Sequence, residues 1–134
     1  MPSHNRQRHY YFEQIGVTPY CLDVEKSGRG PRWKKQRQKY GFDDRQTWNL
    51  DFTMICLLYE RLRMYKDVAA IVDLEWHKIT VGKETKTQGQ WINELIRDCE
   101  DYFKESDTLE NGAGIYTAKN IWEIWVELQD VMWW

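Results

Sequence analysis

Apolar side chains recur at a helical period through residues 43–66, which is the most regular stretch of the chain. Met54 and Leu58 widen the apolar side that this period creates. Asp43 is followed three residues later by Gln46, a spacing typical of a capping box, so we expect the helix to begin there. The pattern predicts a central helix whose apolar side carries Trp48, Phe52, Ile55, Tyr59, Leu62 and Tyr65.

The pattern is weaker after Lys66 and allows two interpretations. The helix can continue to about Trp76 and be followed by a loop, because apolar residues keep a helical spacing up to that point. Alternatively, residues 77–87 form a small strand and turn around Gly82. We favour the helix followed by a loop.

Two more amphipathic stretches follow. Thr87 and Gln90 form a second candidate capping box, and apolar residues then trace one face of a helix through Lys104. The last predicted helix runs from about Tyr116 to the end of the chain. Its expected inner side carries Ile121, Trp122, Trp125, Leu128, Val131 and Met132. These segments predict a mainly α fold, a small bundle of three to four helices.

The first 40 residues differ from the rest in composition. All three prolines of the chain lie there, together with Gly16, Gly28 and Gly30. Because proline and glycine interrupt regular structure, we expect a largely irregular arm with at most a short strand or turn around residues 15–24. The predicted organisation is an N-terminal arm over residues 1–40 and a helical bundle domain over residues 41–134.

Charge follows the same division. The chain has a net charge of −2, but residues 1–39 alone sum to +6, so the remainder carries −8. A basic arm thus precedes an acidic body. The two parts can attract each other, or each can simply be solvated, and the sequence leaves both explanations open.

Cysteine content and hydropathy bear on the cellular compartment of the protein. Cys21, Cys56 and Cys99 are widely spaced and odd in number, which indicates neither a disulfide framework nor a zinc ribbon. We expect reduced thiols, with Cys56 and Cys99 as small core residues. The first residues lack the apolar segment of a signal peptide, and no apolar run approaches the roughly 18 residues of a membrane span. We therefore expect a cytoplasmic protein without membrane contact.

Motifs for catalysis are missing from the sequence. It contains neither a phosphate-binding loop nor a dinucleotide fingerprint, and its histidines do not stand at zinc-ligand spacing from the cysteines. Asp98, Asp101 and Glu105 share one helix face and can attract a cation or a basic partner, but we favour a solvated surface. We expect no catalytic residues, no metal and no cofactor, and hence no enzyme.

The basic segment before the first helix is the main candidate site. Cations interleaved with aromatic rings can neutralise phosphates while a ring stacks on a base, and cations can equally dock on an acidic protein. If the segment is helical, Trp33 and Arg37 share one side of it. The candidate partner-binding or phosphate-binding residues are Arg29, Arg32, Trp33, Lys34, Lys35, Arg37 and Lys39.

The chain closes on Trp133 and Trp134, and adjacent helical positions cannot both point inward. Either one ring is exposed and marks an interface, for example in a homo-oligomer, or both fold over the end of the bundle. Both interpretations stay open.

The stretch YGFDDRQTWNLDFTMICLLYERLRMYKD resembles a signature of small uncharacterised proteins of tailed bacteriophages. The family usually has proline where this chain has Glu60, so we expect a straighter helix here. The resemblance covers residues 40–134, loosely outside the first helix, and implies a phage-encoded protein made in a bacterial cytosol. It also suggests Trp48, Asn49, Asp51 and Arg61 as a shared structural core. The matching residues are Gly41, Phe42, Asp44, Trp48, Asn49, Leu50, Asp51, Thr53, Arg61, Leu62 and Arg63.

Two functions follow from these observations. The first is a non-enzymatic, phage-encoded binding protein that engages and modulates a host protein complex, with defence systems as one target. The second is a module that binds nucleic acid or a nucleotide through the basic segment, with Trp33 stacking on a base.

Overall fold

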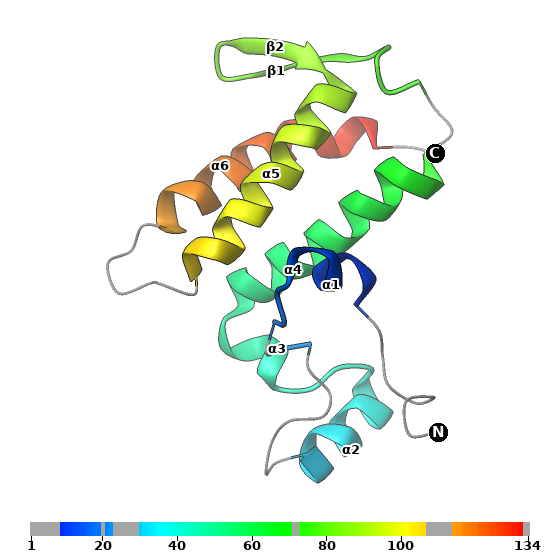
Figure 1. The fold of residues 1–134 in the computed structure, drawn as a ribbon, viewed down its shortest axis with the longest axis vertical. Helices are drawn as coiled ribbons and strands as arrows, with labels where there is room; N and C mark the ends of the chain where they lie inside the picture. The colour runs from blue at the N-terminus through cyan, green and yellow to red at the C-terminus, as the bar shows by residue number, and fades with distance from the viewer. Residues whose placement is uncertain (1–8, 20, 23–29, 71–72, 107–113, 133–134) are drawn as a thin grey trace. The chain divides into compact units, whose positions relative to one another are not determined.

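The computed structural model describes residues 9–19, 21, 22, 30–70, 73–106 and 114–132. Helices dominate this part of the chain, together with one two-stranded antiparallel sheet (Figure 1). The predicted mainly α fold is confirmed. The chain divides into two compact units, unit 1 (Met1–Leu57) and unit 2 (Leu58–Trp134). This division lies inside helix α4 (Leu50–Met64), whereas the boundary predicted from composition follows residue 40.

Unit 1 contains helices α1 (Tyr10–Ile15), α2 (Gly30–Tyr40) and α3 (Arg45–Trp48) and the first part of α4. The prediction of a largely irregular arm is wrong for its described residues, because α1 and α2 fall within it. Pro31 lies in the first turn of α2, where the missing N–H would have no helical partner and the fixed φ of proline suits a helix. A proline there is compatible with a helix rather than a signal against one.

The predicted helix start at Asp43 is also wrong. The chain forms the short helix α3 first, breaks at Asn49, and begins α4 at Leu50. Asp43 and Gln46 do not cap each other through their side chains. The Gln46 side-chain amide instead donates to the carbonyl of Cys21 at 3.4 Å, and the Asp43 carboxylate binds guanidinium groups.

The apolar side predicted for the central helix is correct in its middle and wrong at its start. Ile55, Tyr59 and Leu62 are buried, whereas Trp48 and Met54 are about half exposed. Cys56, on the same helix, is buried, as expected for a small core residue. Other buried apolar side chains of unit 1 are Tyr11, Phe12, Cys21, Leu22 and Trp33.

In unit 2, α4 ends in a π-helical turn at Tyr65–Ala69, and a hairpin of β1 (Lys78–Val81) and β2 (Glu84–Thr87) follows. The favoured loop is therefore wrong, and the alternative strand and turn is confirmed. Val81 pairs with Glu84, so the connection has only two residues. Gly82, the first of them, adopts φ +63°, a conformation that glycine takes without strain.

Helix α5 (Gln88–Ser106) begins directly after the hairpin, and the predicted capping box is confirmed. The Gln90 side-chain carbonyl accepts from the Thr87 backbone N–H at 3.0 Å, and the Thr87 hydroxyl accepts from the Gln90 N–H at 3.2 Å. The next N–H groups also find acceptors, because Gln88 and Gly89 donate to the carbonyls of His77 and Leu74. The start of α5 is thus satisfied by the hairpin and the segment before it.

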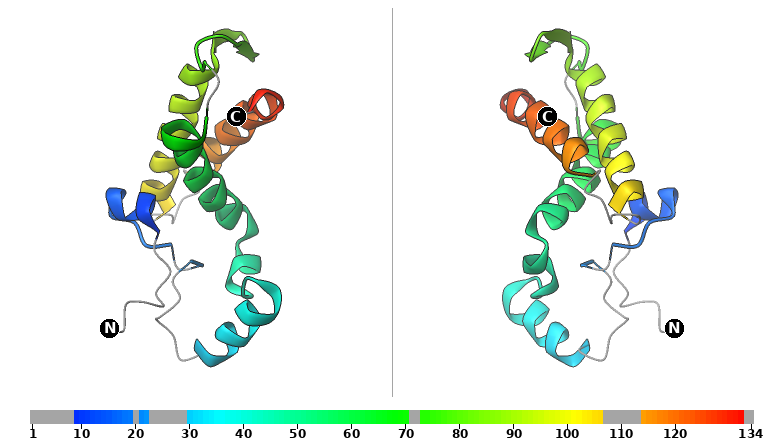
Figure 2. Two further views of the ribbon diagram at one scale, coloured as in Figure 1. Left: turned by 90° about the vertical axis from the view of Figure 1, so that its right-hand side faces the viewer. Right: turned by 90° about the vertical axis from the view of Figure 1, so that its left-hand side faces the viewer.

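Helix α6 (Gly114–Leu128) packs beside α5 and ends in a 3₁₀ turn at Gln129–Val131 (Figures 1 and 2). The hairpin contacts both helices. From α6 the most buried side chains are Ile121, Ile124 and Leu128, spaced for one face of a helix. Trp122 and Trp125, expected on the inner side, are only half-buried beside this row. The buried apolar side chains of α5 are Trp91, Ile92, Leu95, Ile96, Cys99, Tyr102 and Phe103, which confirms Cys99 as a core residue.

Candidate functional site on helix α2

Helix α2 carries most of the residues predicted to bind a partner or phosphate. As expected for a helical segment, Trp33 and Arg37 lie on the inward side, where Trp33 is buried and Arg37 is half-buried. Arg32, Lys34, Lys35 and Lys39 are exposed. Arg29 lies outside the described residues, as do Trp133 and Trp134.

The Asp43 carboxylate joins α2 to α3 within unit 1. It accepts hydrogen bonds from Arg45, from Nε at 3.0 Å and from a terminal nitrogen at 2.8 Å, and one from Arg37 at 2.7 Å. It also accepts the backbone N–H of Arg45 at 3.1 Å. The side chains of Asp43 and Arg45 are only 1% and 3% exposed, so this is a buried ion pair with nearly complete hydrogen bonding.

The neighbouring carboxylate, of Asp44, holds the side chains of α2 itself. Trp33 Nε1 donates to it at 2.8 Å, Arg32 forms an ion pair with it at 2.7 Å, and the Gln36 amide donates at 3.3 Å. The Gln36 side-chain carbonyl in turn accepts the Asp44 backbone N–H at 2.9 Å. We call this set of contacts the aspartate clasp, made by Asp43 and Asp44 with Arg32, Trp33, Gln36, Arg37 and Arg45.

The Trp33 ring is enclosed by this clasp. The Arg45 guanidinium lies 4.0 Å from the centroid of the ring, and Trp48 meets it edge-on at 6.0 Å. Such cation–π and aromatic contacts add to the burial of the ring. Trp33 is only 7% exposed, so its ring is occupied inside unit 1, and the hypothesis that it stacks on a nucleic-acid base is not supported.

The ionisation of Asp43 follows from its partners. Burial alone would raise the pKa of the carboxyl, but hydrogen bonds from Arg45 and Arg37 and the charge of Arg45 outweigh burial. The pKa of Asp43 is therefore lower than its ordinary value, and the clasp is charged at neutral pH. The buried ion pair cannot be predicted from the sequence, because the acidic pair after α2 has the pattern of a helix cap.

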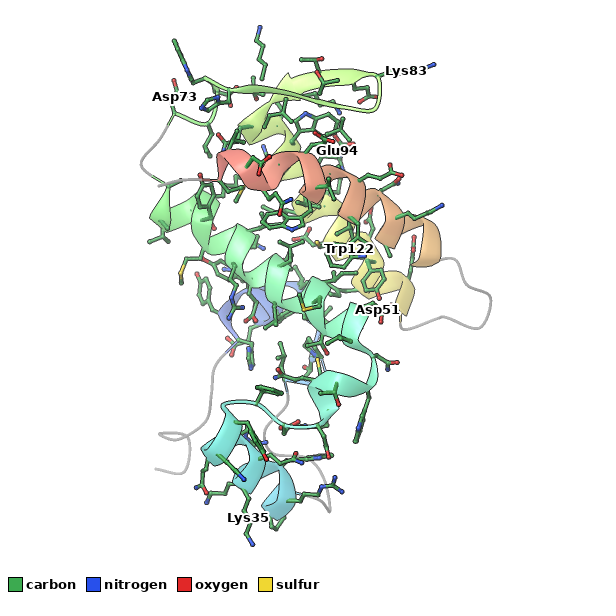
Figure 3. The ribbon with its side chains drawn as sticks, turned by 180° about the vertical axis from the view of Figure 1, so that it is seen from behind. Lys35, Asp51, Asp73, Lys83, Glu94 and Trp122 are labelled. Atoms are coloured by element: carbon green, nitrogen blue, oxygen red, sulfur yellow. The ribbon has the colours of Figure 1, made fainter. Side chains whose placement is uncertain are left out.

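Three lysines of α2 face outward and make no ion pair with any described residue. Lys34 and Lys35 are exposed, and Lys39 lies beside the ring of Tyr40, with Nζ 5.1 Å from its centroid. In Figure 3 the Lys35 side chain extends away from the helix. We call Lys34, Lys35 and Lys39 the lysine face. It contains the cations of α2 that the clasp leaves without a carboxylate partner.

Large apolar side chains are also exposed on unit 1, in the sequence that follows the lysine face. Their exposed fractions are 60% for Tyr40, 47% for Phe42, 49% for Trp48 and 57% for Leu50. The helical pattern predicts Trp48 in the core, and this prediction is wrong. Trp48, Asn49, Asp51 and Arg61, which the phage resemblance suggested as a structural core, are all exposed, and this expectation is wrong. Exposed aromatic groups near cations are typical of protein interfaces.

The acidic face considered for unit 2 contains one carboxyl with an unusual pKa. Burial raises the pKa of Asp98 to about 6, and the nearby charges of Glu94 and Asp101 act in the same direction. Elsewhere in unit 2, Glu100 is paired, because it accepts the Tyr59 hydroxyl at 2.8 Å and lies 3.5 Å from Arg63. Tyr59 and Arg63 of α4 thus contact Glu100 of α5.

In the described ranges, no three histidine, cysteine or acidic side chains gather as a metal site. No helix in those ranges is both long and apolar enough to cross a membrane. No family model matches the chain, and neither a curated protein nor a solved structure matches it significantly.

Proposed function

We propose that this protein is a non-enzymatic binding protein whose lysine face docks on an acidic surface of a protein partner. The observation that carries the proposal is the separation of charges on α2. Arg32 and Arg37 have carboxylate partners in the clasp, whereas Lys34, Lys35 and Lys39 have none among the described residues. The clasp fixes the helix, so these lysines are presented without the cost of ordering an unfolded segment.

Exposed rings favour a protein over other anionic partners. Tyr40, Phe42 and Trp48 offer apolar area close in sequence to the lysine face, and aromatic residues are enriched in protein interfaces. Charge complementarity would then set the rate and specificity of association, and the rings would supply affinity.

The resemblance to tailed-phage proteins gives this proposal a setting. In that setting the partner is a host protein complex in the bacterial cytosol, and the binding protein modulates it, with a defence system as one target. The exposure of Trp48, Asn49, Asp51 and Arg61 supports a role for these residues at a surface.

Nucleic acid is the second candidate partner, and the lysine face is the observation that favours it. Lysines without carboxylate partners bind phosphates and release counterions, which makes such binding strongly dependent on salt. The burial of Trp33 argues against base stacking, so any such binding would rest on phosphate contacts.

A zero-length carbodiimide cross-linker, which joins a lysine amine directly to a carboxylate, tests the proposal. The tagged protein is treated with it in bacterial extract, and the linked peptides are mapped by mass spectrometry. We expect Lys34, Lys35 and Lys39 to link to acidic residues of one protein. The charge-reversed variant K34E/K35E/K39E should lose that partner about tenfold or more.

Three exposed lysines of unit 2 provide the matched control, K78E/K83E/K104E, which should retain the partner. Equal loss in both variants, or links only from the control lysines, would contradict the proposal. Binding to short single-stranded and duplex DNA is measured in parallel at low and high salt. Salt-sensitive affinity that depends on the lysine face, without a protein partner, would establish the second candidate instead.

A further inference from the structure

An open groove lies within unit 2, between the turn of the hairpin and one side of α6. Val81 and Gly82 line it from the hairpin. Its volume is about 490 Å³, which is in the range of pockets that hold small organic groups. The residues of α6 that line it are Trp122, Glu123, Val126 and Glu127.

The hairpin side of this groove is held in place by its packing. Strand β1 contacts α6, and the indole N–H of Trp91, on α5, donates to the carbonyl of Ile79 in β1 at 2.7 Å. Both of these side chains are buried. At Gly82 the edge of the groove is open, because a Cβ there would meet no atom within 4 Å. The groove is therefore formed before a ligand arrives, which lowers the cost of ordering on binding.

Apolar side chains form one part of the lining. Val126 is 56% exposed, and Val81 and Trp122 are half-buried. Hydrocarbon groups of a ligand can pack against the two valines, and an indole ring is the aromatic group that attracts a cation most strongly. The groove thus suits a ligand that combines an apolar stem with a positive charge.

The other part of the lining is acidic. Glu123 and Glu127 stand four positions apart on α6, are exposed, and form no ion pair with any described residue. Lys83, the other residue of the turn, does not line the groove, and its side chain extends beyond the end of the hairpin (Figure 3). Unit 2 has 15 acidic and nine basic side chains, a net charge of −6, so an anionic ligand is disfavoured. A bare metal ion is disfavoured as well, because only two of the lining side chains can coordinate it.

We propose that this groove binds an arginine side chain from a basic segment of a partner protein. The planar guanidinium can stack on the Trp122 ring while its N–H groups donate to the carboxylates of Glu123 and Glu127. A lysine would meet the same carboxylates as a point charge without the planar stacking, so it should bind more weakly. The inference does not rest on the lysine face, which belongs to unit 1 and has the opposite charge.

Titration of the full chain with a short peptide, followed by nuclear magnetic resonance, tests the proposal. The probe is a capped peptide of three arginines separated by glycines, and its two counterparts carry lysine or citrulline, the neutral analogue of arginine, at the same positions. We expect the arginine peptide to shift the indole N–H signal of Trp122 and the backbone amide signals of Val81, Gly82 and Val126. The lysine peptide should bind more weakly, and the citrulline peptide should bind about tenfold or more weakly than the arginine peptide.

Two double variants separate the groove from the general acidity of unit 2. E123Q/E127Q should weaken binding of the arginine peptide about tenfold or more, whereas D67N/D101N removes the same charge at two other exposed positions and should change it little. If a variant fails to fold, the comparison of the three peptides on the wild-type chain still decides the question. The proposal is overturned if the signals of the groove do not shift, if the citrulline peptide binds as tightly as the arginine peptide, or if both variants weaken binding equally.

Discussion

Around α2 a single tryptophan is held by charged side chains, whereas between α5 and α6 rows of aliphatic and aromatic side chains pack without them. In unit 1 the contacts of Asp43 and Asp44 are short and directional, and each depends on one atom of one partner. In unit 2 Leu95, Ile121 and Leu128 are fully buried and apolar. The stability of the first arrangement depends on pH and charge, and the stability of the second depends on the volume of its buried side chains. Substitutions can therefore distinguish the two arrangements by their effects on stability.

Removing one carboxylate of the clasp should have the largest effect. Asp43→Asn leaves the Arg45 guanidinium, whose side chain is 3% exposed, without its buried countercharge. We expect the free energy of unfolding near neutral pH to fall by about 3 to 5 kcal/mol, the usual cost of breaking a buried ion pair. Urea denaturation followed by circular dichroism measures it. Asp51→Asn, at an exposed acid of α4, is the control and should cost less than about 1 kcal/mol.

The same variant should show a defined pH dependence. The pKa of Asp43 is about 3.8 in the unfolded chain and lower in the folded one, so its stabilisation is fully present above 3.8. It is lost as the pH falls through the folded value. The difference between wild type and Asp43→Asn should therefore narrow on acidification below that pH, and a constant difference would show that the clasp is not electrostatic.

A cavity in unit 2 should have a similar or slightly smaller effect, with no such pH dependence. Leu95→Ala removes a fully buried side chain from α5, and we expect a loss of about 3 kcal/mol. The same denaturation experiment at two pH values checks both its size and its constancy. Val126→Ala, at a side chain 56% exposed on α6, should change stability by less than about 0.5 kcal/mol. If the loss of stability from Leu95→Ala varied with pH like that from Asp43→Asn, the two units would not differ in the pH dependence of their stability.

The smallest effect is expected at Asp98, where unit 2 does contain a charge in an unfavourable place. Its pKa is about 6 in the folded protein and 3.8 in the unfolded chain, so its stabilising contribution is complete below 3.8 and is lost as the pH rises through 6. Asp98→Asn should therefore be slightly more stable than wild type above pH 6 and equal to it near pH 3.8. Thermal melts across this range test the sign, and Glu123→Gln on the exposed side of α6 should show no such gain.

The regular part of the fold could be predicted because its signals are local. Thr87 and Gln90 cap α5 through atoms that are close together in the sequence. The apolar residues that follow them recur at a helical period on one face, which has to pack against only one other surface. Helix α2 was missed because Pro31 and its neighbouring glycines were counted as interruptions, although a proline is favoured in a first turn. The hairpin was found only as an alternative, since four-residue strands give a weak pattern.

The candidate site was predicted by residue type but not by role. The sequence identified Lys34, Lys35 and Lys39 together with Arg32 and Arg37, and it could not show which of these cations are paired. That distinction depends on where two adjacent carboxylates point after the chain reverses direction beyond α2. The prediction that Trp33 stacks on a nucleic-acid base fails for the same reason. The hydrogen bond that holds Trp33 goes to Asp44, 11 positions away, and no periodic pattern indicates it.

The two sides of α2 differ in what they contact: one side forms the clasp, and the other is exposed. Among the residues of α2, those in the clasp are Arg32, Trp33, Gln36 and Arg37, whereas Pro31, Lys34, Lys35, Gln38 and Lys39 are exposed and have no part in it. A combinatorial library at positions 34, 35, 38 and 39 should therefore retain the folded helix in most of its members. If the lysine face docks on a partner as proposed, its positions can change rapidly in evolution to follow a changing partner while the positions that hold the helix in place stay constant.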